Sequence, residues 1–152
     1  MTYLIAFLIC AAAAGFEALC AGRDPMAALK ATRQPSWSPP TWAWALIGLA
    51  WYAICFTALA RLVPLRPDSN MPLVLLVLVM LANGAANLFQ FRLKRLDLAF
   101  FFLFPYWLLL AGFVLLAWPL DRVSGVLFSI YAAYQLYAAL WAYRLWRLNP
   151  SA

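Results

Sequence analysis

The chain has 152 residues, of which 68% are hydrophobic and 11% charged, with a net charge of +6 and a mean hydropathy of +0.85. A soluble domain has no interior large enough for so much apolar surface, so the composition excludes a soluble globular protein and indicates an integral membrane protein. In a soluble protein the positive charge would suggest a nucleic-acid partner. Here its distribution over the loops fits membrane topology and contact with anionic lipids better, and no nucleic-acid partner is expected.

Five apolar stretches are each about as long as the roughly 20 residues that a helix needs to cross a bilayer. They are residues 3–21, 42–62, 71–91, 98–118 and 123–146. Residues 71–82 do not alternate apolar and polar side chains, which disfavours a β-barrel. No basic residue precedes the first stretch, which disfavours a signal peptide. The predicted fold is an all-α integral membrane protein, a five-transmembrane-helix bundle with a long first loop, forming one domain over residues 1–152.

The basic residues of the loops are divided unevenly between the two ends of such a bundle. One end holds three of them, Arg61, Arg66 and Arg122, and the other end holds the remaining eight. Cytoplasmic loops are enriched in Lys and Arg, so the end with eight is expected to be cytoplasmic. The C-terminus is then cytoplasmic and the N-terminus lies outside.

The first stretch contains one acidic residue, Glu17, about one turn before its end. A carboxylate at this depth is costly unless it is protonated, paired or near the interface. Two interpretations remain open. Glu17 either forms a structural pair, with Arg23 or Arg33 as candidate partners, or has a functional role.

The longest connection, residues 22–41, is the one segment large enough to form a lid outside the membrane. Its part DPMAALKA (24–31) predicts a short interfacial helix capped by Asp24, because Asp followed by Pro is a favourable helix start. Its part QPSWSPP (34–40) carries three prolines, which prevent a helix. A rigid loop with Trp37 at its centre would close one end of the bundle, or Trp37 serves as an interfacial anchor.

The third stretch has the clearest polar signal of the chain. Asn83, Asn87 and Gln90 lie four and three residues apart, which places their amides on one helical face. Amides in hydrocarbon need partners, so this face is expected to point into the bundle. The amides either bond neighbouring helices or contact a ligand in a cavity, and the two roles are compatible. Ala82 and Ala86 are a small-residue pair suited to a neighbouring helix or to a second subunit.

The second and fifth stretches carry aromatic residues at helical spacing. In the second stretch Trp44, Trp51 and Tyr52 fit packing against lipid and neighbouring helices. In the fifth stretch the aromatic residues recur at offsets of three and four, with a small residue beside them: Tyr131, Tyr134, Tyr137 and Trp141, with Ala138. Tyrosine hydroxyls require partners when buried, so a lipid-facing stripe would more readily be Leu, Val or Phe. The fifth-stretch face is therefore predicted to point inward.

The segment QPSWSPPTW (34–42), followed by Tyr52, resembles the K-P-x-W-x-P-P-x-W…Y signature of the TspO/MBR family, the translocator or tryptophan-rich sensory proteins. The spacing of Asn83, Asn87 and Phe91 is similar to a later family segment. The tyrosines of the fifth stretch and the terminal WRLN resemble the family's last helix. The resemblance covers essentially the whole chain.

This resemblance implies a divergent bacterial-type member in the inner membrane, with a pocket inside the bundle under the first loop. The family pocket binds porphyrins, sterols and synthetic aromatic ligands, and bacterial members are dimers linked to tetrapyrrole regulation or transport. The implied ligand-binding residues are Trp37, Pro39, Pro40, Trp44, Tyr52, Asn83, Asn87, Tyr131, Tyr134, Tyr137 and Ala138. A homodimer through the third helix is a possible assembly.

The chain departs from the family pattern at positions that line the family's pocket. Family tryptophans fall on Gly48 and Ala86, and a family asparagine falls on Ala142. The family's W-Y-x-x-L segment falls on Ala28 and Leu29. These positions carry smaller or less polar side chains here.

Three functions follow from these features. The leading one is a binding, transport or sensory protein for a flat hydrophobic ligand, a porphyrin or sterol-like lipid, with the basic loop side available for an acidic substituent. The second is a membrane enzyme that degrades a porphyrin or isomerises a lipid. The absence of histidine and of a catalytic constellation argues against it. The third is a structural subunit of a larger membrane complex. No cofactor or metal is required by the leading function.

Overall fold

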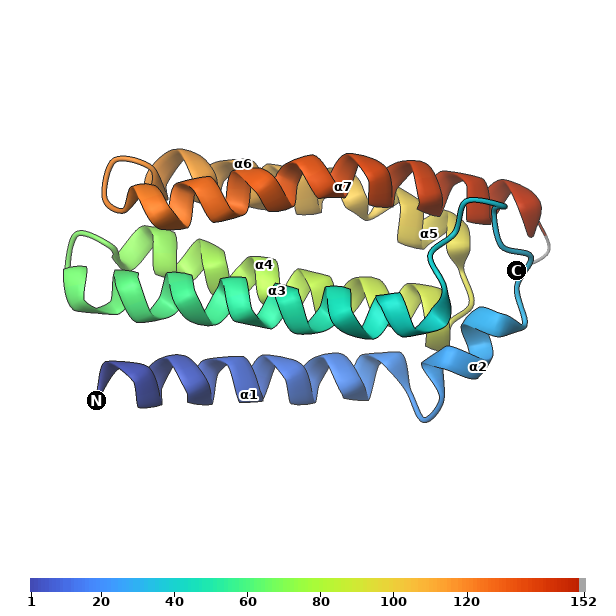
Figure 1. Cartoon of the computed structure of the whole chain (residues 1–152), viewed down its shortest axis with the longest axis horizontal. Coiled ribbons are helices and arrows are strands. Elements are labelled where there is room, and N and C mark those ends of the chain that lie inside the picture. The colour runs from blue at the N-terminus through green and yellow to red at the C-terminus, as the bar shows by residue number, and fades with distance from the viewer. Residues whose placement is uncertain (151–152) are drawn as a thin grey trace.

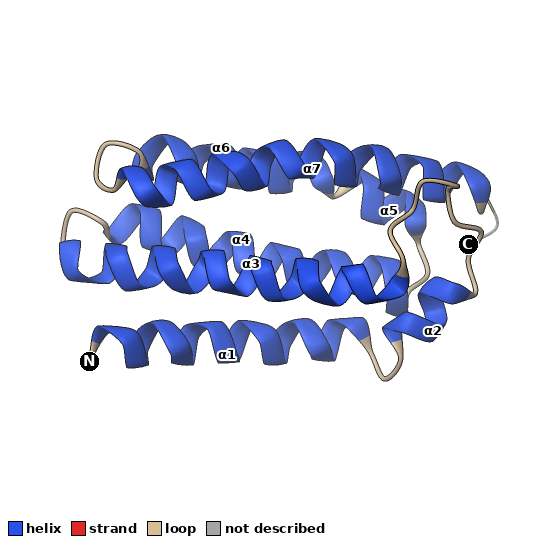
Figure 2. Cartoon of the chain, in the orientation of Figure 1, coloured by secondary structure: helices blue, strands red, loops and turns tan. Residues whose placement is uncertain are grey.

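The computed structural model describes residues 1–150, and its regular elements are all helices, joined by loops and without strands (Figures 1 and 2). The elements are α1 (Thr2–Ala21), α2 (Pro25–Lys30), α3 (Thr41–Leu62), η1 (Val63–Leu65), α4 (Asn70–Asn87), η2 (Leu88–Arg92), α5 (Leu96–Phe101), α6 (Leu103–Ala117) and α7 (Arg122–Leu148). Five segments are long and apolar enough to cross a membrane. They lie side by side along one axis, which confirms the predicted five-helix membrane bundle.

Two of the predicted stretches are not continuous α-helices. The third, predicted over 71–91, is α4 followed by the wider π-helical turn η2. The fourth, predicted over 98–118, is divided into α5 and α6 at Phe102. Pro105 explains this break, because it has no N–H for the carbonyl of Phe101 and its ring crowds that carbonyl.

The first loop begins as the sequence predicts. Gly22 ends α1 with φ of 83°, in the left-handed region that favours glycine. Asp24 then caps α2, because its Oδ1 accepts a hydrogen bond of 2.8 Å from the backbone N–H of Ala27. This confirms the short helix and its cap, and α2 lies across one end of the bundle (Figure 1).

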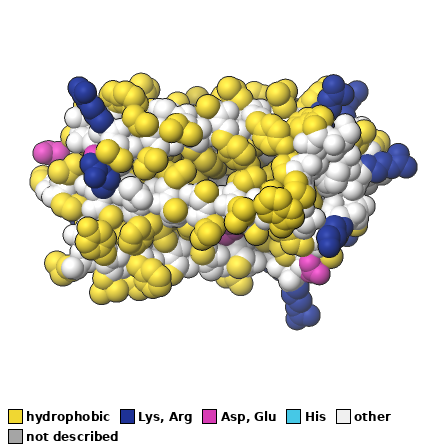
Figure 3. All heavy atoms as spheres, in the orientation of Figure 1, with side chains coloured by type: hydrophobic (Ala, Val, Ile, Leu, Met, Phe, Trp, Pro, Cys, Tyr) yellow, Lys and Arg dark blue, Asp and Glu magenta, His cyan; other side chains and the backbone are white. Residues whose placement is uncertain are grey.

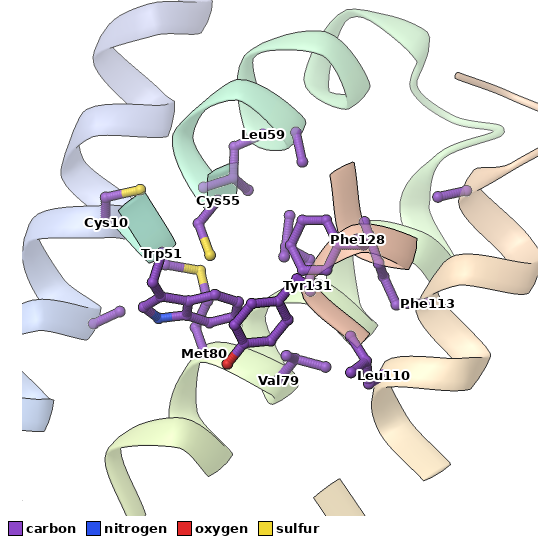
Figure 4. Close-up of a cluster of buried hydrophobic side chains, with 14 of the residues drawn as sticks. Cys10, Trp51, Cys55, Leu59, Val79, Met80, Leu110, Phe113, Phe128 and Tyr131 are labelled. Carbon is purple, nitrogen blue, oxygen red and sulfur yellow. The ribbon is translucent and has the colours of Figure 1, made fainter. Parts of the chain in front are cut away.

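The main buried core is formed by all five membrane segments and contains a cluster of aromatic side chains from α3, α6 and α7 among aliphatic and small ones (Figure 4). Trp51 stacks on Tyr131 with ring centroids 4.4 Å apart, and Phe113 packs on Phe128 at 4.3 Å. Tyr131 and Trp141 are both buried, which confirms that the aromatic face of the fifth stretch points inward. In a bilayer such van der Waals packing is a main source of helix association, because lipid offers no hydrophobic driving force.

Helices α1 and α4 lie close together at Gly84. A Cβ atom added there would lie 2.8 Å from the Phe16 ring and 3.3 Å from the Cα atom of Glu17. Glycine is therefore needed at this position for α1 to lie against α4. Of the predicted small-residue pair, Ala82 is buried within the bundle and Ala86 lines the cavity described below.

An ion pair lies at the end of the bundle opposite α2. Arg61 donates hydrogen bonds of 2.7 to 3.0 Å to both carboxylate oxygens of Asp121. Asp121 also caps α7 by accepting from the backbone N–H and the hydroxyl of Ser124. The Arg61 guanidinium, together with the donors of Ser124, holds the pKa of Asp121 well below its ordinary value.

The surface agrees with a membrane location. Lys and Arg side chains gather at the two ends of the molecule, and hydrophobic side chains cover the sides between them (Figure 3). Large apolar side chains such as Leu19, Leu108 and Leu115 are more than 70% exposed, a state that is favourable only in contact with lipid.

Candidate functional site

A cavity of about 280 Å³ lies inside the bundle beside α2. All five membrane segments and α2 contribute to its wall. Its polar lining residues are Glu17, Asn83, Asn87, Gln90 and Gln135, and its aromatic lining residues are Trp44, Trp51, Phe91, Tyr131, Tyr134 and Trp141. A mostly apolar wall with a few placed polar groups is typical of small-molecule sites, and this volume is near the lower end of their range.

Glu17 is the centre of the polar part of the wall. Its Oε1 accepts 2.8 Å from the amide of Asn87, and its Oε2 accepts 2.6 Å from the Tyr52 hydroxyl and 3.3 Å from the amide of Asn83. The predicted inward direction of the amide face is thus confirmed, with Glu17 as the interhelical partner. These contacts join α1, α3 and α4.

The expected pairing of Glu17 with Arg23 or Arg33 is wrong. The two ion pairs of the described residues are Arg61–Asp121 and Arg95–Asp97, and neither includes Glu17. The helix turn that carries Glu17 faces α4, where Gly84 allows a close approach, and so the carboxylate meets amides before it can reach the loop arginines.

The aromatic part of the wall is formed by α3 and α7. The rings of Trp44 and Trp141 lie 4.6 Å apart, and Trp51 and Tyr131 are stacked. The Tyr131 hydroxyl bonds the Tyr106 hydroxyl at 2.8 Å and accepts from the amide of Gln135. The indole N–H groups of Trp44 and Trp51 are buried and have no hydrogen-bond partner among the described residues.

The first loop closes this end of the bundle in two parts. Helix α2 lines the cavity directly through Pro25, Met26 and Leu29. The proline-rich segment lies further out and is held to α7. Trp141 Nε1 donates 3.0 Å to the Ser38 hydroxyl, and the Tyr137 hydroxyl donates 3.3 Å to the backbone carbonyl of Trp37.

The structure brings together six of the eleven residues predicted to bind a ligand. Trp44, Asn83, Asn87, Tyr131, Tyr134 and Ala138 line the cavity, whereas Trp37, Pro39, Pro40, Tyr52 and Tyr137 are not part of its wall. Tyr52 is outside the wall but contacts it, because its hydroxyl donates a hydrogen bond to Glu17. Trp37 packs edge-on against Tyr137 at 5.3 Å, and both belong to the contact between the loop and α7.

Sequence reasoning missed two lining residues of note. The spacing of Trp51 predicts only packing, whereas the residue is 4% exposed and belongs to both the core and the cavity wall. Gln135 is not part of the predicted aromatic face, but it is 6% exposed, lines the cavity and donates a hydrogen bond to Tyr131. The sequence signal that could have identified Gln135 is its position as an amide in the middle of an apolar helix.

The departures from the family pattern gather at this cavity. Leu29, Gly48, Ala86 and Ala142 all line it. A Cβ atom added at Gly48 meets no atom within 4 Å. The small side chains therefore leave open space in the wall.

The charge of the wall differs from the sequence-based expectation. Glu17 is its one ionisable residue apart from the tyrosines, and none of its residues is Lys or Arg. The basic residues at this end lie outside the cavity. The expected basic partner for an acidic substituent is thus not found in the wall.

The helices and their interior cavity define a class, the five-helix membrane proteins with an intramembrane cavity closed by the first loop. A model of the TspO/MBR family matches residues 6–147, and the chain belongs to this family. It is similar to the protein CrtK of Rhodobacter capsulatus, with 26% identity over 151 residues that cover 97% of this chain and 92% of the relative.

Proposed function

We propose that the protein binds a flat hydrophobic ligand of the porphyrin or sterol type in the cavity beside α2. The role of this binding is the transport or the sensing of the ligand. One observation carries this proposal. Aromatic rings of α3 and α7 face a hollow that also contains the carboxylate and amides of Glu17, Asn83 and Asn87. Rings provide stacking area, and the polar groups fix orientation. Since the cavity is small, a porphyrin would be only partly enclosed.

Titration of the detergent-solubilised protein with protoporphyrin IX, followed by quenching of tryptophan emission, tests this proposal. Trp44, Trp51 and Trp141 line the cavity and would report binding directly. We expect saturable quenching with micromolar or tighter affinity. The variant Tyr134→Leu removes a ring from the wall and should weaken binding several-fold, since a stacked aromatic contact contributes about 1 kcal/mol.

A matched control is Tyr143→Leu, the same substitution on the same helix at a residue that is 39% exposed and outside the cavity wall. It should bind as the unchanged protein does. Quenching that does not saturate, or that the two variants weaken equally, contradicts a porphyrin site in this cavity.

A further inference from the structure

The hydrogen-bond partners of Glu17 in the cavity are all neutral groups. Both carboxyl oxygens accept, from Asn87 at one oxygen and from Tyr52 and Asn83 at the other. These partners are a hydroxyl and two amides, so none of them brings a positive charge to the carboxyl group.

No residue of the wall is placed to form an ion pair with this carboxyl group. Its three donors are neutral, and no Lys or Arg lines the cavity. Among the basic residues of this end, Arg92 donates to the backbone carbonyl of Leu19 at 3.4 Å, and Arg95 is paired with Asp97. A carboxylate within a bilayer is strongly favoured by a positive partner. Glu17, which lines the cavity, is therefore available to a positively charged group of a ligand.

Two further properties of the cavity favour a ligand that carries a cationic group. An ionised carboxylate has about four acceptor positions, and three donors occupy Glu17, one of them at the long distance of 3.3 Å. The remaining wall is rich in aromatic rings, including Trp44, Trp51 and Tyr134. The faces of such rings attract cations, more strongly when water is excluded.

We infer that the cavity selects flat hydrophobic molecules that carry a protonated amine. Glu17 accepts a hydrogen bond from this amine, and the aromatic rings contact the apolar part of the ligand. The inference rests on the proposed function and names its ligand class. An acidic group placed at Glu17 is disfavoured, because its charge would meet the carboxyl group with no cation in the wall to compensate. A porphyrin, which the cavity would enclose only in part, would therefore have to keep its carboxylates outside the cavity.

Three matched probes test the inference. Anthracene carrying an aminomethyl, a hydroxymethyl or a carboxylate group at the same ring position presents one flat body as a cation, a neutral molecule and an anion. The protein is placed in nanodiscs of zwitterionic lipid at neutral pH, and energy transfer from tryptophan to anthracene is measured after subtraction of empty nanodiscs. We expect the amine to bind about tenfold more tightly than the alcohol, the scale of one charge-assisted hydrogen bond, and the acid to bind most weakly.

The variant Glu17→Gln should abolish this preference, so that amine and alcohol bind alike. Asp24→Asn is the matched control, since it removes one negative charge at the same end, outside the cavity wall, and asparagine still caps a helix. It should keep the tenfold preference. Helix content by circular dichroism verifies that both variants fold.

The outcomes separate the two proposals. Equal binding of all three probes to the unchanged protein overturns the inference and leaves the cavity as a binding site, whether or not Glu17→Gln folds. A preference for the amine that persists in a folded Glu17→Gln variant also overturns it. If neither the probes nor protoporphyrin IX bind saturably, the proposed function fails and the inference fails with it.

Discussion

Asp121 connects the ends of α3 and α7 through a single carboxylate. It accepts from Arg61 and also caps α7 through Ser124. Because its pKa is lowered in the folded protein, its contribution to stability is complete above its unfolded pKa of about 3.9. That contribution is lost as the pH falls below this value toward the folded pKa.

Replacement of Asp121 by Asn should therefore remove part of the acid sensitivity of the fold. Asparagine keeps a capping oxygen for α7 but carries no charge for Arg61. We expect the variant to unfold at a lower temperature than the unchanged protein at neutral pH, and the difference to shrink as the pH falls below about 4. Thermal unfolding followed by circular dichroism across this range measures it. Asp68→Asn, an exposed residue in another loop at the same end, is the control, and an equal pH dependence of both variants would contradict the prediction.

Gly48 lies in the wall of the cavity. A side chain added at this position would start in open space. A tryptophan here would occupy a large share of about 280 Å³. We expect Gly48→Trp to bind protoporphyrin IX at least several-fold more weakly by the quenching titration, without loss of helix content. Gly15→Trp, also in open space but outside this cavity, should bind normally. Tighter binding to Gly48→Trp would show that the added ring is a contact and not an obstruction.

At the scale of the elements, the contact of α1 with α4 depends on Gly84. A leucine at this position must displace the Phe16 ring and the backbone at Glu17. Overpacking of this kind costs about 1–3 kcal/mol. It should also separate Glu17 from Asn83 and Asn87 and thereby weaken ligand binding.

Gly15→Leu is the matched control for Gly84→Leu, because a side chain at residue 15 meets nothing within 4 Å. Unfolding by a denaturing detergent, followed by tryptophan emission, should show a lower midpoint for Gly84→Leu alone. Equal midpoints for the two variants would mean that α1 can move away from α4 without cost.

The elements themselves were largely predictable from the sequence. Apolar stretches of bilayer length predict the five membrane segments, and the pair Asp24–Pro25 predicts the start of α2. The inward direction of Asn83 and Asn87 follows from their spacing, because one helical face must satisfy both amides. These properties depend on residues that are close together in the sequence, so they can be predicted without knowing which helices pack against each other.

The partners of these groups were not predictable, because they depend on which helices face each other. The contact of Glu17 with Tyr52 and Asn87 joins residues 35 and 70 positions apart, and it requires the close approach at Gly84. The resemblance placed the pocket under the first loop. It did not indicate that α2 forms the wall while Trp37 and Pro39 lie outside it.

For the whole molecule, the distribution of basic residues predicts its direction in the membrane. The end that carries α2 and the C-terminus holds eight of the eleven Lys and Arg residues, so we expect it to be cytoplasmic. Green fluorescent protein fused after residue 152 should then fluoresce in a bacterial host, and alkaline phosphatase fused at the same position should be inactive. Active phosphatase at that position would reverse the assignment, and the cavity beside α2 would then be approached from outside the cell.

The contact between the first loop and α7 has a consequence for the order of synthesis. Asn149 accepts a hydrogen bond from the backbone N–H of Arg33 and donates one to its carbonyl, 116 positions earlier in the chain. Trp141 likewise holds Ser38. The loop leaves the ribosome with the first helices, but the residues that fix it, and a large part of the cavity wall, emerge only with α7. During insertion the loop must therefore remain unfastened beside an open bundle, and the cavity is completed in the last step of assembly.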